Sequence, residues 1–173
     1  MNLIAAYKFA DIFRTASETV AIESSTNLNR HLYGFKKTEV DSMLNEAVIR
    51  VLKNGMWDLA TCADGQPNVV PVAFKDVTED GKLVVGDVFL ETTLHNLAAN
   101  NGRIAVSVYD AQNLEGYQIK GTAEYVKEGP VVDTFKAMVE AMFHGAATAK
   151  GALIITPEKV IVTTPGADNK KEL

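Results

Sequence analysis

The sequence predicts a mainly β, α+β fold: an antiparallel barrel with flanking helices. From residue 57 onward, most of the chain reads as about six or seven short β-rich runs, separated by turn signals such as Asp64-Gly65. A few segments instead repeat apolar residues at helical spacing. These helices are too few to alternate with the strands in βαβ repeats, so hairpin pairing is favoured over a doubly wound sheet.

Composition restricts the domain count and the partners. The chain has 173 residues, of which 47% are hydrophobic and 23% are charged, as is typical of one globular domain with a filled core. Its formal net charge is −5. Because a negative surface is repelled by polyanions, we expect neither nucleic acid nor an anionic membrane as the partner.

One cysteine and the apolar opening bear on the compartment. Cys62 is the only cysteine, which excludes an internal disulfide and a thiolate-rich metal site, and we expect it to be a buried small residue rather than a nucleophile. Lys8 and Asp11 interrupt the apolar opening, unlike a secretory signal, and no run is long enough to span a membrane. We expect a cytoplasmic protein, with organelle targeting by the amphipathic opening as the alternative.

Two helices are predicted before the first strand. Apolar residues at helical spacing predict a short amphipathic helix over 3–15, followed by an irregular arm. A second helix is predicted to begin at Thr38, where Thr38 and Asp41 form a variant of the capping box. Gly55 stands where a left-handed helix cap is expected.

A hairpin follows the second helix. The runs WDLATC and PNVVPVAFKDV are β-rich, and Asp64-Gly65 between them is a strong two-residue turn signal. Pro67 and Pro71 cannot donate to a ladder, so the second run is predicted to be an edge strand or a bulged strand. The sequence TEDGK then turns the chain into the strand LVVGDVF.

The stretch from Lys82 to Asp110 is the main candidate for a binding site. It is predicted as strand, turn, short helix and strand, with Thr92 and Thr93 able to cap the helix. Two hydroxyls beside the free N–H groups of a helix start suit a phosphate. The alternative is that the two threonines are helix caps and nothing more.

The C-terminal part is predicted as strands around a long helix. GYQIKGTAEYV reads as a strand, Pro130 lies near the first turn of an amphipathic helix, and GALIITPEKVIVTTPG reads as two short strands around a Thr-Pro-Glu-Lys turn. The polar tail is predicted to be frayed. We expect an N-terminal helix and arm at 1–36, one domain at 37–166 and a flexible tail at 167–173.

The order of these elements resembles that of the pyridoxamine 5′-phosphate oxidase-like proteins. The resemblance runs from about Thr38 to Gly166. It rests on a helix leading into WDLATCADGQPNVVPVAF, the strand LVVGDVF, the crossover ETTLHNLAANNGRIAVSVYD, and GYQIKGTAEYV followed by a long helix. The resemblance implies a Greek-key-like antiparallel split barrel that binds FMN at a homodimer interface.

The resemblance also implies cofactor-binding positions. The phosphate would be held at Thr92, Thr93 and Asn96. The ring and the ribityl chain would be lined by Pro71, Val72, Ala73, Phe74, Val85, Gly86 and Asp87. Gly86 suits this role because a missing Cβ lets a planar ligand approach the backbone, although a Val-Val-Gly strand needs no ligand to explain it.

The chain departs from the family pattern at two places. Many relatives place an arginine or lysine near the phosphate, whereas the threonine pair here is neutral, which leaves Lys75 or Lys120 to supply the charge. The true oxidase carries basic residues near its C-terminus, and here the tail TTPGADNKKEL has no Arg-x-His. We therefore do not expect vitamin B6 oxidase activity.

The sequence shows no catalytic constellation. His31, His95 and His144 lie far apart and none has metal-ligand spacing, so we expect no metal. We expect an FMN-dependent oxidoreductase that acts on a small-molecule substrate or uses an electron donor such as NAD(P)H. The alternatives are a non-enzymatic flavin carrier or electron-transfer protein, and a split barrel that binds a deazaflavin or haem.

Overall fold

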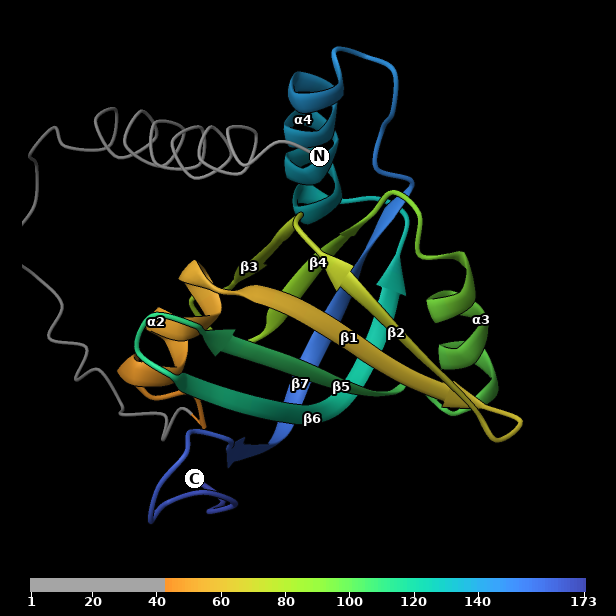
Figure 1. Cartoon of the computed structure of the whole chain (residues 1–173). Coiled ribbons are helices and arrows are strands. Elements are labelled where there is room, and N and C mark those ends of the chain that lie inside the picture. Colours follow the sequence, from red (N-terminus) through yellow and green to blue (C-terminus); the bar gives the residue numbers. More distant parts are fainter. Residues whose placement is uncertain (1–42) are drawn as a thin grey trace, which may run out of the picture. The chain divides into compact units, whose positions relative to one another are not determined.

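The computed structural model describes residues 43–173, which form one curled antiparallel sheet with helices around it (Figure 1). In chain order the elements are α2 (Glu46–Asn54), β1 (Met56–Ala63), β2 (Gln66–Val72), β3 (Lys75–Val77), β4 (Leu83–Asp87), α3 (Glu91–Ala99), β5 (Arg103–Asp110), β6 (Glu115–Val126), α4 (Pro130–Phe143) and β7 (Gly151–Val162). The predicted helix over 3–15, the arm and the Thr38–Asp41 capping box lie outside the described residues.

A two-residue connection between the two edge strands closes the sheet. The strand order is β2-β1-β5-β6-β7-β4-β3, so the two edge strands are consecutive in sequence and are joined only by Ala73 and Phe74. Because so few residues span only about 10 Å, the two edges must lie close together and the sheet must curl. The N–H of Gly86 donates to the carbonyl of Phe74 at 2.8 Å, which ties the connection to β4. The predicted antiparallel split barrel is confirmed.

The core of the barrel is filled from the sheet and from α2. Inward residues alternate along the strands: Trp57 and Leu59 on β1 are fully buried, whereas Met56 beside them is 49% exposed. Val48 and Leu52 of α2 belong to the same cluster of buried side chains. The helix therefore contributes directly to the barrel core.

The C-terminal end of α2 is bound to two strands through one carbonyl. The oxygen of Leu52 accepts the indole Nε1–H of Trp57 at 2.7 Å and the Nζ of Lys75 at 2.6 Å. Lys75 also donates to the oxygen of Lys53 at 3.0 Å, and its amine lies 5.1 Å from the centre of the Trp57 ring. These bonds fix α2 to β1 and to β3 across the closure of the sheet.

This helix begins later than predicted; it ends at Gly55 as predicted, but Gly55 does not adopt the predicted left-handed conformation. Residues 43–45 are not helical, and α2 begins at Glu46, where the Oδ1 of Asn45 accepts the N–H of Val48 at 3.0 Å. Gly55 is extended, with φ −83° and ψ 160°, rather than left-handed. A Cβ there would lie 2.8 Å from Val108 and 2.9 Å from the oxygen of Val51, so glycine allows close packing where the helix passes directly into β1.

The predicted Asp64-Gly65 hairpin is confirmed, but the run PNVVPVAFKDV is not one strand, since β2 ends at Val72 and β3 begins at Lys75. Asp64 and Gly65 both have positive φ, at 50° and 72°, as a two-residue turn of this type requires, and Ala63 pairs with Gln66. β2, which contains Pro67 and Pro71, lies at an edge of the sheet. The turn TEDGK also joins two antiparallel strands, β3 and β4.

The C-terminal segment differs from its prediction. Gly151–Val162 is one strand rather than two, and Pro157 pairs with Gly121 at a register shift in the β6–β7 ladder. β4 pairs with residues 151–155 only, so Pro157 lies beyond that ladder, where a missing N–H is tolerated. The tail is exposed but attached: the N–H of Leu173 donates to the oxygen of Val160, and Lys170 donates to the oxygen of Val162.

Helix α4 covers β4 and β7 from outside the barrel core, through a second apolar cluster. It begins at Pro130, as predicted. Its buried residues Val132, Phe135 and Val139 pack with Val84 of β4 and Ala152 of β7. The outer side of β4, the strand that leads into α3, is therefore covered by an apolar cluster that is separate from the barrel core.

We predict that Lys75 makes stability depend on pH. Burial lowers the pKa of Lys75 from its ordinary value of 10.5 to about 8, with Asp76 opposing the shift. Since the unfolded chain then binds this proton more tightly, the free energy of unfolding should rise with pH between about 8 and 10. Urea unfolding of the wild type and of Lys75→Met at several pH values should show a difference that grows in favour of the wild type. The exposed Lys127→Met serves as the control, and a pH-independent difference at Lys75 would contradict the assignment.

Candidate functional site

The start of α3 is anchored by the last residue of β4. Asp87 is 1% exposed, and its Oδ1 accepts the N–H of Leu90 at 3.0 Å. Its Oδ2 accepts the phenol O–H of Tyr125 at 2.8 Å, and its carbonyl accepts the N–H of Lys150 at 2.7 Å. One residue therefore joins β4, β6, the helix start and the segment before β7.

No side chain caps the N-terminus of α3. The N-cap residue is Leu90, which has no side-chain acceptor, and Thr92 and Thr93 lie inside the first turn, so the prediction that they cap the helix was wrong. A first turn has N–H groups without helical partners and a positive partial charge. At α2, by contrast, Asn45 accepts one of these groups. The start of α3 therefore retains N–H donors for an external acceptor.

A buried polar cluster attaches α3 to the β1–β2 hairpin. The Nδ2 of Asn68 donates to the hydroxyls of Thr61, at 3.3 Å, and of Thr93, at 3.2 Å. The Nδ2 of Asn96 also donates to Thr61, at 3.2 Å. Thr93 is 1% exposed and Asn96 is 5% exposed. The structure therefore uses these two predicted phosphate residues to hold the helix, and leaves Thr92 exposed.

Sequence reasoning missed Thr61 and Asn68. These residues pair directly across the hairpin. Two polar residues opposite each other, on the face where neighbouring inward residues are apolar, were the available signal. Their hydrogen bonds to Thr93 and Asn96 could not be read from the local pattern, because the helix follows them by about 25 to 35 residues.

The residues predicted to line the ring divide into two groups. Val85, Gly86 and Asp87 are buried within β4, and a Cβ on Gly86 would lie 2.8 Å from the ring of Phe135. The absence of a side chain at Gly86 is therefore explained by α4, and not by a ligand approaching that face. The remaining predicted residues lie at the β2–β3 connection.

At that connection, exposure again differs between neighbours. Val72 and Phe74 are buried, and the Phe74 ring packs against Phe143 of α4 with centroids 6.2 Å apart. Pro71 is exposed and Ala73 is half-buried. Among the predicted cofactor residues, the accessible side chains are thus those of Pro71, Ala73 and Thr92.

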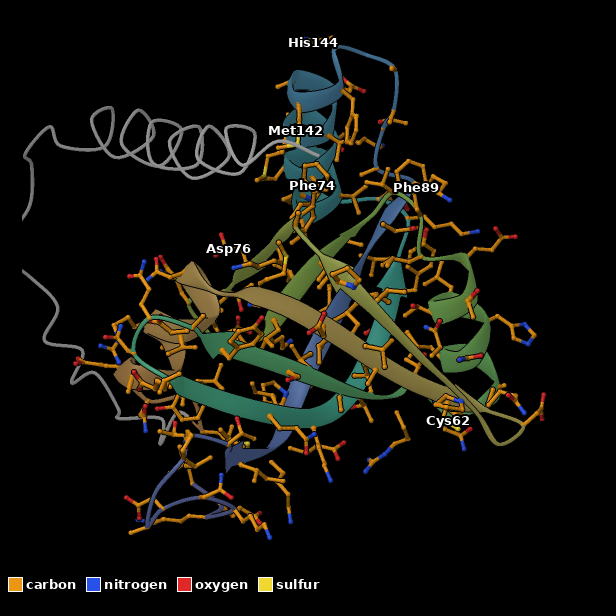
Figure 2. All side chains as sticks on the ribbon, in the orientation of Figure 1. Cys62, Phe74, Asp76, Phe89, Met142 and His144 are labelled. Atoms are coloured by element: carbon orange, nitrogen blue, oxygen red, sulfur yellow. The ribbon has the colours of Figure 1, made fainter. Side chains whose placement is uncertain are left out.

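An exposed aromatic residue lies beside the helix start. Phe89, in the loop between β4 and α3, is 78% exposed, the largest exposed fraction among the large apolar residues of the described chain (Figure 2). The sequence pattern gives no sign of this exposure, because a phenylalanine in a β-rich run is ordinarily a core residue. It offers an apolar surface next to the free N–H groups of α3.

The two lysines considered for the phosphate do not belong to the start of α3. The amine of Lys75 is bound to α2, and Lys120 is exposed on β6, in register with Ala105 of β5. The first turn of α3 instead contains Glu91. A phosphate there would depend on neutral donors.

Other candidate chemistry is not assembled in residues 43–173. Within this part of the chain, no three His, Cys, Asp or Glu side chains group together as metal ligands. Cys62 is exposed rather than buried, since β1 alternates and this position faces outward with Met56. His95 is exposed on α3. No helix of the described chain is long and apolar enough to cross a membrane.

A polar surface pocket lies elsewhere, near the start of α2 and the C-terminal tail. It has a volume of about 380 Å³ and includes Asn45, Glu115, Tyr117, Thr164 and Lys171 in its lining. None of the predicted cofactor residues lines it. The pocket and the start of α3 are therefore separate features.

Comparisons with known proteins match most of the part of the chain that the structure describes. The model of the pyridoxamine 5′-phosphate oxidase family matches residues 46–166. The uncharacterized protein MJ0282 of Methanocaldococcus jannaschii is 30% identical over 131 residues, which are 74% of this chain and 86% of that protein.

Solved structures show the same fold. HupZ of Group A Streptococcus has 26% identity and a TM-score of 0.62, over 72% of this chain and 97% of that one. An FMN-binding protein from Syntrophomonas wolfei has 15% identity and a TM-score of 0.62, over 73% and 90% of the two chains. At that identity the second likeness concerns the fold alone.

Proposed function

The chain belongs to the pyridoxamine 5′-phosphate oxidase family, and from this membership we propose that it binds FMN and transfers electrons through it. The observation that carries the proposal is the uncapped start of α3, whose free N–H groups follow the buried end of β4. A structural relative with the same fold is an FMN-binding protein, which supports the choice of cofactor.

The residues at the start of α3 fit a phosphate in part. Free N–H groups at a helix start and the exposed Thr92 hydroxyl are suitable donors for an anion. Glu91 opposes it, because a carboxylate in the first turn adds like charge. The fit therefore rests on backbone donors and the helix dipole, with no lysine or arginine in the first turn.

The remaining residues orient the cofactor. Thr93 and Asn96 hold α3 to the hairpin, so its N–H groups keep a fixed direction. The β2–β3 connection, with exposed Pro71 and half-buried Ala73, offers backbone groups for the ring, and Phe89 offers an apolar face. When bound, FMN supplies the hydride or electron transfer, while the protein binds it and excludes water.

A flavin carrier without turnover is the second candidate. The accessible predicted side chains, Pro71, Ala73 and Thr92, include no acid or base. The site thus offers no side chain that would distinguish an oxidoreductase from a carrier, and the redox chemistry of FMN serves both. A deazaflavin or haem ligand is an outcome to be checked by absorbance. The tail lacks the Arg-x-His of the true oxidase, so vitamin B6 oxidation is not proposed.

We predict that the full chain binds FMN more tightly than riboflavin, because only FMN carries the phosphate. Thr92→Val keeps the side-chain shape and removes the hydroxyl, and should weaken FMN by roughly tenfold, the effect of one hydrogen bond to an anion, with riboflavin unchanged. Flavin fluorescence quenching measures both affinities. Equal loss of the two ligands would contradict the phosphate assignment, and binding of neither flavin would overturn the proposed function.

We predict that the FMN-loaded protein oxidises NADH or NADPH when an electron acceptor is present. The nicotinamide absorbance should fall catalytically, over many equivalents per protein. The apo-protein mixed with the same acceptor is the control. A single stoichiometric reduction, or none, would favour the carrier over the oxidoreductase.

The partner we propose is a second copy of the chain. Val69, Met56 and Tyr109 are 62%, 49% and 58% exposed on the outward face of β2, β1 and β5. Small residues adjoin them, since Ala60 pairs with both Val69 and Ala105. Asp58, which pairs with Pro71 and with Ser107 on the same face, makes this surface mixed rather than wholly apolar, and mixed surfaces are usual in protein interfaces.

We predict that Val69→Glu converts a homodimer into monomers, because the charge would be buried without a partner. Size-exclusion chromatography with light scattering gives the mass of each species. Leu173→Glu, at an exposed position of the C-terminal tail, is the matched control and should remain dimeric. A monomeric wild type, or a dimeric Val69→Glu protein, would reject this interface.

A further inference from the structure

We infer that Asp87 and Tyr125 are positioning residues for the proposed flavin site: together they fix the direction of the first turn of α3. This inference rests on the proposed function, since it concerns the same helix start. Neither residue would touch the cofactor. Asp87 was predicted to line the ring, and its 1% exposure assigns it this different role.

The geometry places the carboxylate between the helix start and the sheet. The Oδ1 of Asp87 accepts the N–H of Leu90, the N-cap residue, and Leu90 in turn accepts the first helical bond from Leu94 at 2.8 Å. The other oxygen, Oδ2, accepts the phenol of Tyr125 at 2.8 Å. This series of hydrogen bonds thus runs from Tyr125 on β6, through the Asp87 carboxylate, to Leu90 at the start of α3.

The space for the phenol is provided by a glycine. A Cβ on Gly151 would lie 2.5 Å from the Tyr125 hydroxyl, so any side chain there would displace the ring. Burial and the hydrogen bond to Asp87 raise the pKa of Tyr125 to about 12, so the phenol remains a donor at neutral pH. With this donor in place, the Oδ2 of the buried carboxylate is satisfied.

The pair is not needed to hold the strands together. Asp87 pairs with Gly151 and Tyr125 pairs with Leu153 in the β4–β7–β6 part of the sheet. These ladders persist when the phenol hydroxyl is removed. Removing the hydroxyl changes the carboxylate of Asp87 instead. It loses the hydrogen bond on Oδ2 and is then free to rotate, which moves the oxygen that accepts the N–H of Leu90. Val88 and Phe89 alone separate Asp87 from Leu90, so a small rotation redirects the free N–H groups.

The role is geometric rather than electrostatic. A carboxylate near a phosphate is unfavourable by charge, so its presence calls for another reason, and the bond to Leu90 provides one. Asp87→Asn keeps an Oδ1 acceptor for Leu90 and removes the negative charge. It also keeps a bond to Tyr125 with the direction reversed, because the amide Nδ2 can donate to the phenol oxygen. It should therefore preserve the preference for FMN over riboflavin, within about twofold.

The chain contains a matched control for Tyr125. Tyr117 lies on the same strand, also donates its phenol to a carboxylate at 2.8 Å, that of Glu115, and also has a pKa raised to about 12. It lines the polar pocket near α2 and has no bond to α3. Tyr125→Phe and Tyr117→Phe thus remove similar hydrogen bonds from opposite ends of β6.

The experiment measures the ratio of the riboflavin and FMN dissociation constants for the full-length wild type, Tyr125→Phe, Tyr117→Phe and Asp87→Asn, with thermal unfolding to establish folding. Tyr125→Phe should reduce the ratio roughly fivefold, as expected for a misaligned hydrogen bond to an anion, while Tyr117→Phe leaves it unchanged. General destabilisation would weaken both flavins alike and leave the ratio constant.

Three results would overturn the inference. If the wild type prefers FMN but Tyr125→Phe behaves as Tyr117→Phe does, the positioning role fails while the proposed function stands. If Asp87→Asn loses as much preference as Tyr125→Phe, the carboxylate does not act through geometry. If the wild type binds neither flavin, the proposed function fails and the positioning role fails with it.

Discussion

The two-residue connection between the edge strands is the constraint from which the rest of the structure follows. Ala73 and Phe74 force β2 and β3 to lie near each other although they stand at opposite ends of the strand order. The sheet must curl, and its concave face becomes a core that α2 helps to fill. The Leu52 carbonyl then bonds to Trp57 and Lys75, on the two sides of the closure. The TEDGK turn keeps β4 next to β3, and the N–H of Gly86 is bonded to Phe74, so that α3 begins near the connection that carries the other accessible candidate residues.

The strands were predictable because their signals are local. A two-residue turn requires positive φ, which Asp64-Gly65 supplies, and prolines restrict β2 to an edge. The predictions from sequence failed where contacts with residues distant along the chain determine the local conformation. Gly55 carries the signal of a helix cap, but its close neighbours are Val108 and Tyr109, more than 50 residues away. The sequence around Pro157 predicts a turn, yet a register shift in the β6–β7 ladder accommodates this proline within one strand.

In the candidate site too, local features could be predicted from the sequence, and contacts between distant residues could not. The sequence located the helix start after LVVGDVF, but it gave Thr92 and Thr93 as phosphate contacts or caps, and it left open whether Gly86 faces a ligand. Thr93 is instead engaged by Asn68, and Gly86 makes room for Phe135. Both partners are remote in sequence, so no local pattern could reveal them. Tyr125 is a similar case, since a tyrosine in a β-strand has many explanations until the buried carboxylate beside it is seen.

The prolines of β2 have a consequence for aggregation. A barrel closed by ladder bonds all round has no open strand edge, but this one is closed by the chain and leaves the outer side of β2 without a neighbour in the sheet. Counting from the turn pair Ala63 and Gln66, Pro67 and Pro71 occupy positions whose N–H would point to that outer side. Each removes a donor that an incoming strand would need. The split architecture thus carries its own protection against growth by strand addition at β2, and the contact proposed between two copies uses the outward face instead of this edge.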